Sequence, residues 1–190
     1  MKKIDYKNLV FLSVLPLIFI SNTFEKGLFV GFILLITSLI IKGLSYLINK
    51  YTSDRFRVYS YLLLTTTILS VFTIILKTFF VFDDLVFIYL SLIILNVNIF
   101  NPNEDLKLLD QLLISLSSLL LLIIIGGLRE VLGSGQIEFI NLGSKTLKLF
   151  DSKYGITFLK DASGGFILSG FIFGLFNLID LDKKENNDDL

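Results

Sequence analysis

The chain has 190 residues, of which 54% are hydrophobic and only 18% are charged, and its mean hydropathy is +0.78. This composition excludes an ordinary soluble domain, because a water-facing surface of that size needs more charge. The 17 Lys and Arg residues balance 17 Asp and Glu residues, so no basic surface for nucleic acid is expected. With no Cys and no His, disulfides and the metal or nucleophilic sites that depend on thiolate or imidazole are excluded within this chain.

Six apolar runs, separated by segments that hold most of the charges, predict helices that span a membrane. A spanning helix needs about 20 apolar residues, and the runs lack the strict alternation of barrel strands. The runs are Leu9–Ile20, Leu28–Ile48, Val58–Leu76, Leu85–Phe100, Leu108–Leu128 and Ala162–Leu181. We therefore expect an all-α, polytopic membrane protein with six transmembrane helices in a single membrane domain, residues 1–190.

The basic residues predict how these helices are oriented. The first run follows Lys2, Lys3 and Lys7 as a signal peptide would, but no small-residue cleavage site comes after it, so we expect it to be retained. Six crossings place most of the Lys and Arg on the side of the termini, whereas the two short opposite loops hold only Lys26 and Lys77. Both termini are therefore expected to be cytoplasmic. The basic loop 129–161 is the exception to this pattern.

Two of the runs are short for a span, and they occupy equivalent places in the chain. Leu9–Ile20 contains Pro16, and Leu85–Phe100 ends in Asn96, Val97 and Asn98. When the sequence is shifted against itself by one constant number of residues, Leu15 aligns with Val97, and the second run aligns with Asp110–Glu130. This predicts a 3+3 repeat over residues 8–80 and 85–181, with an outer loop at 129–161 and a disordered tail at 182–190.

Because each repeat has an odd number of helices, the second repeat enters the membrane in the sense opposite to the first. The shortened helices of such inverted repeats tend to meet near the midplane. Pro16, Asn96 and Asn98 are therefore candidate midplane or ion-path residues. The alternative is that the first run is a peripheral anchor and that both Asn residues lie among lipid headgroups. Asp110, at the start of the fifth run, could accept a proton or a sodium ion, or could simply complement the helix dipole.

Further candidates lie at the end of the fifth run and in the last run. Arg129 and Glu130 could contact a partner subunit, or could form an interfacial arginine held by a local carboxylate. Gly133 and Gly135 suit a helix end followed by a glycine turn. A stripe of small residues, which favours close helix packing within the chain or against a partner, is formed by Gly164, Gly165, Gly170 and Gly174.

The segment Leu128-Arg129-Glu130-Val131-Leu132-Gly133-Ser134-Gly135 resembles a turn of the NqrDE/RnfAE family of integral membrane proteins, closest to its RnfE and NqrD branch. Three shorter stretches agree in order and spacing: Leu15-Pro16-Leu17, Arg57-Val58-x-x-Tyr61 and Gly164-Gly165-Phe166-Ile167. The resemblance covers residues 8–180. It implies six helices in an inverted repeat, a homologous six-helix partner, and a multisubunit Rnf/Nqr-like complex of the bacterial inner membrane that couples electron transfer to ion movement.

The same resemblance implies an iron–sulfur centre shared by the two homologous partners through a Cys on each interrupted helix. In this sequence Leu15 and Val97 occupy those Cys positions, and aliphatic side chains cannot ligate iron. We therefore expect no cofactor ligand in this chain, and no NADH oxidation, because nucleotide-binding loops are lacking. Two alternatives stay open: a small secondary transporter or channel that kept the fold, and a purely structural protein of the assembly.

Overall fold

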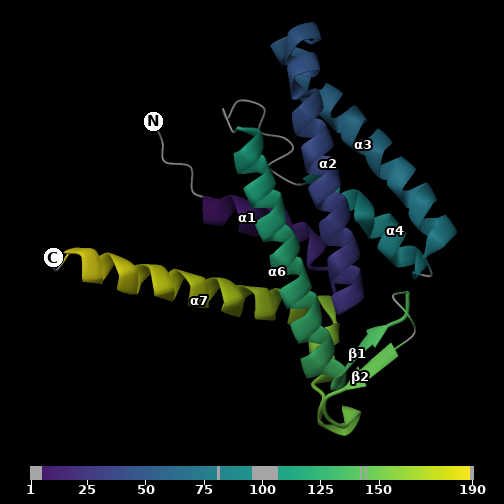
Figure 1. The fold of residues 1–190 in the computed structure, drawn as a ribbon, viewed down its shortest axis with the longest axis vertical. Coiled ribbons are helices and arrows are strands. Elements are labelled where there is room, and N and C mark those ends of the chain that lie inside the picture. Colours follow the sequence, from purple (N-terminus) through teal and green to yellow (C-terminus); the bar gives the residue numbers. More distant parts are fainter. Residues whose placement is uncertain (1–5, 81, 96–106, 142, 144, 189–190) are drawn as a thin grey trace.

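The computed structural model describes residues 6–80, 82–95, 107–141, 143 and 145–188, which are mostly helical (Figure 1). Each of the six predicted runs contains a helix. The first half comprises α1 (Tyr6–Val14) with the 3-10 turn η1 (Leu15–Leu17), then α2 (Phe24–Tyr51) and α3 (Asp54–Phe79). The second half begins with α4 (Asp84–Leu90), the 3-10 turn η2 (Ser91–Leu95) and α6 (Leu108–Ser134). The strands β1 (Gln136–Phe139) and β2 (Lys145–Lys148) follow. The 3-10 turns η3 (Ser152–Tyr154) and η4 (Thr157–Lys160) then lead to α7 (Ala162–Asp188).

Three helices in the described part of the chain, α2, α3 and α6, are long and apolar enough to cross a membrane. Their outward faces are apolar as well: Leu63 and Phe79 of α3 are 71% and 75% exposed. A soluble protein rarely exposes apolar surface of this extent, whereas lipid solvates it without cost. The apolar helices at Tyr6–Leu17, Asp84–Ile94 and Ala162–Leu178 are shorter.

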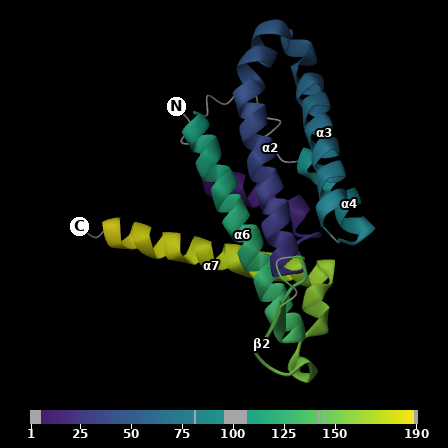
Figure 2. The same cartoon turned by 45° about the vertical axis from the view of Figure 1, so that its right-hand side comes forward.

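The centre of the fold is the contact between α2 and α6, which run antiparallel and lie side by side in Figures 1 and 2. Glycines allow their backbones to touch: a Cβ on Gly27 would lie 2.6 Å from the carbonyl oxygen of Leu122, and one on Gly126 would lie 2.5 Å from that of Thr23. Helices of a membrane protein gain stability from such close approach, since burying apolar groups gives little when the solvent is lipid. Antiparallel α2 and α6 are what an inverted repeat requires, and the repeat itself stays a prediction.

The two short helices meet beside this pair, because η1 contacts η2. Each 3-10 turn continues an α-helix, and Pro16 at the start of η1 explains the first change of geometry, since proline has no N–H to donate. Phe19, just beyond η1, packs on Tyr89 of α4 with ring centroids 4.3 Å apart. Leu17 and Ile93 are fully buried at the contact. The two short segments therefore meet, as predicted, through the residues of η1 and η2 that the structure describes.

Two regions differ from the sequence-based expectation. The tail predicted to be disordered from Asp182 is helical as far as Asp188, because no Gly or Pro follows Gly174 to end α7, and Lys and Glu favour helix. The predicted loop 129–161 begins inside α6 and carries an antiparallel hairpin, with Gln136 paired to Lys148 and Phe139 to Lys145. Figures 1 and 2 both show α7 running across α2 and α6 rather than along them.

Candidate functional site

Arg129 forms the most densely bonded polar centre among the residues that the structure describes. The side chain is fully buried near the end of α6, although arginine carries its charge in any protein environment. It donates five hydrogen bonds, all to main-chain carbonyl oxygens. The acceptors are Ile18 at 2.6 Å, Lys160 at 2.8 Å, Ser21 at 2.9 Å, and Leu159 and Asp161 at 3.0 Å. Every N–H of the guanidinium therefore has a partner.

The carbonyls that Arg129 binds belong to two breaks in the helical structure. Ile18 and Ser21 follow η1, where the first short helix ends, and the last carbonyls of a helix lack partners within it. The other three acceptors lie in and after η4, just before α7 begins. A cation suits the end of the short helix, because the negative end of a helix dipole lies at the C-terminus. Arg129 thereby fixes the end of the first short helix to the start of the last helix.

Glu130 makes a separate set of contacts. Its carboxylate oxygens accept hydrogen bonds of 2.8 Å from the backbone N–H of Phe24, the first residue of α2, and of 2.8 Å from that of Glu138 in β1. The local carboxylate expected for Arg129 is replaced by main-chain carbonyls. Both side chains are buried within their own chain, and a contact of this region with a partner stays a prediction.

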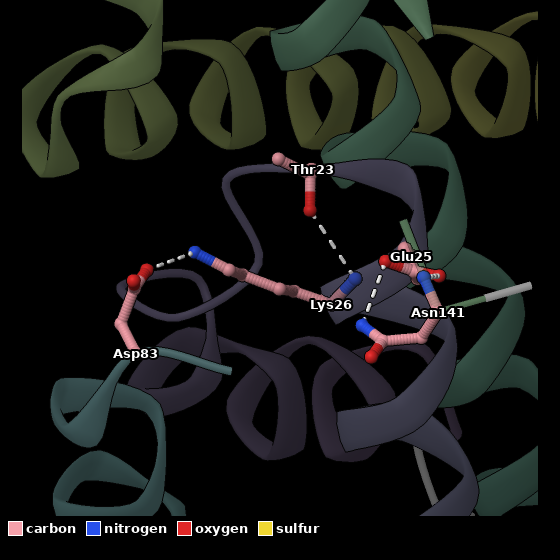
Figure 3. A network of polar contacts seen from close by, with 5 residues as sticks. All are labelled: Thr23, Glu25, Lys26, Asp83 and Asn141. Carbon is pink, nitrogen blue, oxygen red and sulfur yellow. Dashed lines mark hydrogen bonds and ion pairs between the residues drawn. The ribbon is translucent and has the colours of Figure 1, made fainter. Parts of the chain in front are cut away.

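The turn between α1 and α2 is held by a further polar network, drawn in Figure 3. Thr23 caps α2 by accepting a hydrogen bond from Lys26 N, and buried Glu25 accepts bonds from Asn141 N at 2.7 Å and Asn141 Nδ2 at 3.1 Å. Lys26 Nζ lies 3.0 Å from Asp83 Oδ2, just before α4. These contacts were not predicted from the sequence. The polar triplet before α2, followed by an acidic residue in its first turn, was the available signal.

The predicted glycines have different surroundings. Gly135 ends α6 in the left-handed conformation, with φ of 72°, as the glycine turn predicts, and Gly133 lies in the last turn of α6 against the side chain of Lys160. A Cβ on Gly165 would lie 2.8 Å from the guanidinium carbon of Arg129. Gly170 and Gly174 have no atom near enough to meet an added Cβ. Only the first part of the predicted stripe therefore packs within this chain.

This difference gives a paired prediction. Gly165→Ala should lower the free energy of unfolding by about 1–3 kcal/mol, because the Arg129 head is held by five bonds and cannot move aside freely. Gly170→Ala should have no such cost and should stabilise α7 slightly, since alanine favours helix by up to about 1 kcal/mol over glycine. Thermal unfolding of both variants in detergent measures the difference. Equal stability of the two would show that Gly165 does not have to accommodate Arg129.

Asp110 lies in the first turn of α6, where its carboxylate accepts hydrogen bonds from Lys107 N at 3.1 Å and from Tyr6 Oη at 3.2 Å. The first bond caps the helix and the second joins α6 to the beginning of α1. These contacts match the simpler of the two sequence interpretations, in which the carboxylate complements the helix N-terminus.

The meeting point of the short helices is apolar. Leu15 is partly buried there and Pro16 follows it at the start of η1, next to the fully buried side chains of Val14, Leu17 and Ile18. Asn96, Val97 and Asn98 lie outside the described residues. Among those that are described, no group of three or more His, Cys, Asp or Glu could hold a metal ion. An iron–sulfur centre needs thiolate or comparable ligands, so the residues present do not fit one.

Long apolar helices paired through glycines, two short helices that meet, and a buried arginine that joins the breaks define an all-α, polytopic membrane protein. The sequence profile of the family described as Rnf-Nqr subunit, membrane protein, matches residues 2–173. The chain belongs to this family.

Curated relatives agree with this assignment. The chain is 26% identical to the E subunit of the ion-translocating oxidoreductase complex of Rhodobacter capsulatus, over 93% of this chain and 81% of the relative. It is 25% identical to the protein of that name from Buchnera aphidicola subsp. Schizaphis graminum, over 86% of this chain and 78% of the relative. A relative of the same name from Buchnera aphidicola subsp. Acyrthosiphon pisum is 33% identical over 40% of this chain and 37% of the relative. No solved structure matches.

Proposed function

We propose that this chain is the counterpart of those E subunits in an ion-translocating oxidoreductase complex, a membrane component of an assembly that couples electron transfer to ion movement. The observation that carries the proposal is the family match over residues 2–173, joined with the contact between η1 and η2. We further propose that the complex lies in a bacterial inner membrane with both termini of this chain in the cytoplasm. The distribution of Lys and Arg supports that orientation.

Within this complex the chain would contribute packing to the short-helix contact and no ligand to an iron–sulfur centre. Leu15 stands where the family resemblance implies a thiolate, and it packs against the buried hydrophobic cluster of the chain. Arg129 would keep the end of the first short helix in place through its bonds to Ile18 and Ser21. Electrons would then travel through other proteins of the complex, while this chain maintains the geometry against which they assemble.

A homologous six-helix protein is the proposed neighbour of α7. Gly170 and Gly174 lie four residues apart on this helix, and space is free beside both. Phe171, which follows the first of them, is 70% exposed. Small residues on an apolar helix let a second helix approach closely, so this face supports contact with another membrane protein of the complex.

Purification in mild detergent through a tag on this chain tests the proposal. We expect it to co-purify with flavin-bearing proteins and with a homologous six-helix partner, and we expect its deletion to abolish ion-coupled electron transfer in membranes. Recovery of the chain as a solitary particle, together with unchanged electron transfer after deletion, would refute the proposal. Iron analysis and electron paramagnetic resonance of the chain purified by itself should show no bound iron.

Liposomes separate this function from the transporter that the sequence left open. The purified chain should leave a vesicle impermeable to sodium ions and protons. A flux that falls with Asn96→Leu would instead favour a transporter or channel.

A further inference from the structure

Polar side chains interrupt the apolar contact between α2 and α6 in the half that lies toward the start of α6. Each of them is at most 4% exposed: Thr37 and Ser38 of α2, and Gln111, Ser115 and Ser118 of α6. Polar groups inside a spanning helix are costly to bury, and those that are kept there usually face the protein interior and serve a function. This polar group is separate from the one around Arg129.

The close contacts of the two helices place these residues at one level. A Cβ on Gly27 would meet the carbonyl of Leu122, and one on Gly31 would lie 3.0 Å from the Cα of Leu119. Because the helices are antiparallel, each step toward the end of α2 corresponds to a step toward the start of α6. Thr37 is therefore level with the turn at 111–115. Residues 111, 115, 118 and 122 are spaced as one face of a helix, and that face of α6 is buried.

The three serines of this group already use their protons. Ser115 Oγ donates to the carbonyl oxygen of Gln111 at 2.8 Å, and Ser118 Oγ donates to that of Ile114 at 2.8 Å. Ser38 Oγ donates to the carbonyl oxygen of Leu35 at 2.9 Å. A hydroxyl group has one proton and two lone pairs, so the serine oxygens can still act as acceptors or ligands.

Two members of the group have no partner. Thr37 Oγ1 is completely enclosed and makes no hydrogen bond to any residue that the structure describes. The Gln111 side chain likewise makes no hydrogen bond within the described part of the chain, although it is 4% exposed. A buried polar atom without a partner lowers stability, so its presence in a folded protein requires an explanation. Threonine can avoid the cost by bonding to the carbonyl four residues earlier, as Thr65 does in α3.

A small cation supplies what this group lacks. Hydroxyl and amide oxygens are ligands that hard cations prefer, and most of the protons here are directed to the backbone. Asp110 precedes Gln111 and adds negative charge at the start of α6. Lys42 follows Thr37 by five residues, so it projects roughly 140° away from it around α2.

We propose that Thr37, Gln111, Ser115 and Ser118 form a binding site for an alkali cation between α2 and α6. Thr37 Oγ1 and the Gln111 carbonyl oxygen are the ligands that have no other partner, and the serine lone pairs complete the site. All of these ligands come from one chain, so binding does not depend on assembly of the proposed complex. The site holds an ion without opening a path through the membrane.

Melting temperatures in different salts test this proposal on the purified full-length chain. Sodium, potassium and choline chloride are compared at equal concentration, choline being too large for the site. We expect at least one alkali salt to raise the melting temperature by about 2–4 °C over choline, because a ligand that binds only the folded state stabilises it. Thr37→Val, which keeps the shape of the side chain, and Gln111→Leu should each abolish this shift. The control Thr67→Val removes an exposed hydroxyl of α3 and should keep it.

Equal melting temperatures of the unchanged chain in all three salts would overturn the proposal, and so would a shift that Thr37→Val retains. If the polar group binds no ion, Thr37→Val should simply be more stable than the unchanged chain in every salt, because it removes an unbonded hydroxyl. Gln111→Met, of similar volume, replaces Gln111→Leu if that variant does not fold.

A thiol reagent provides a second readout, since the chain has no cysteine. A small, water-soluble methanethiosulfonate should modify Ser118→Cys in native membranes, because an ion can enter the site only from water. The stabilising alkali salt should slow this reaction at least about threefold relative to choline. Leu122→Cys, one turn further along the same buried face, should stay unmodified. Reaction of Ser118→Cys at the same rate in every salt would contradict the site, as would no reaction at all.

Discussion

Arg129→Ala should lower the free energy of unfolding by about 3–5 kcal/mol, because it leaves five carbonyl oxygens without their donor, and the bonds to Ile18 and Ser21 are buried. The loss should be global, since those carbonyls belong to the end of the first short helix and to the segment before α7. We expect low yields from membranes, and in detergent a melting temperature well below that of the unchanged chain.

Two further variants make this prediction specific. Arg129→Lys keeps the charge but offers three donors on a single nitrogen, so it should recover only part of the stability. Leu128→Ala changes the preceding residue, which is 38% exposed, and should cost far less. If Arg129→Ala unfolds within about 1 kcal/mol of the unchanged chain, the five bonds do not hold the two helix breaks together.

Gly27→Ala should weaken the contact between α2 and α6 by about 1–3 kcal/mol, because the new methyl group would lie 2.6 Å from the backbone oxygen of Leu122. A backbone oxygen cannot rotate away as a side chain can, so the two helices must separate. Gly27→Leu should enlarge the effect and prevent stable folding. Thermal unfolding in detergent and resistance to proteolysis in membranes both report the loss.

The same helix provides the matched control. Gly43 lies in α2 with no atom within 4 Å of an added Cβ, so Gly43→Ala should stabilise the helix slightly, by up to about 1 kcal/mol. Opposite signs for Gly27→Ala and Gly43→Ala would establish the close crossing. A loss of equal size at both positions would mean that alanine acts through something other than contact with α6.

The helices could be predicted from the sequence because their apolar runs are long and their ends are marked by charges or turn residues. The short first helix was predictable as well, because Pro16 removes an N–H from the backbone. The glycine at position 135 indicated its turn correctly. These signals are local, because each one specifies the structure of only the few residues around it.

Long-range pairing could not be read from the sequence. Arg129 finds its acceptors at Ile18 and Ser21, more than a hundred positions away, and those acceptors are carbonyls that every residue carries. Glu25 likewise depends on Asn141, which follows the first strand of the hairpin. The hairpin itself lies in a segment whose charges predict a loop, and the polar stretch after Gly174 continues α7 because nothing in it stops a helix.

Leu15 lies in the first short helix, at the position where the family resemblance implies a cysteine. The chain keeps the short helix, its proline and the arginine that holds its end, while the residue that the family resemblance assigns to an iron–sulfur centre is Leu15. We propose that packing of the fully buried Val14, Leu17 and Ile18 stabilises the fold at this point.

Cross-linking between the two short helices tests the central claim most directly. The chain has no cysteine, so Phe19→Cys combined with Tyr89→Cys gives one defined pair, at positions where the rings now lie 4.3 Å apart between centroids. A short bifunctional thiol reagent should join this pair in native membranes with high yield. Phe19→Cys with Tyr51→Cys, at the far end of α2 and roughly 40 Å away by helix rise, should stay unlinked. An unlinked Phe19–Tyr89 pair in folded protein would contradict the meeting of the two short helices.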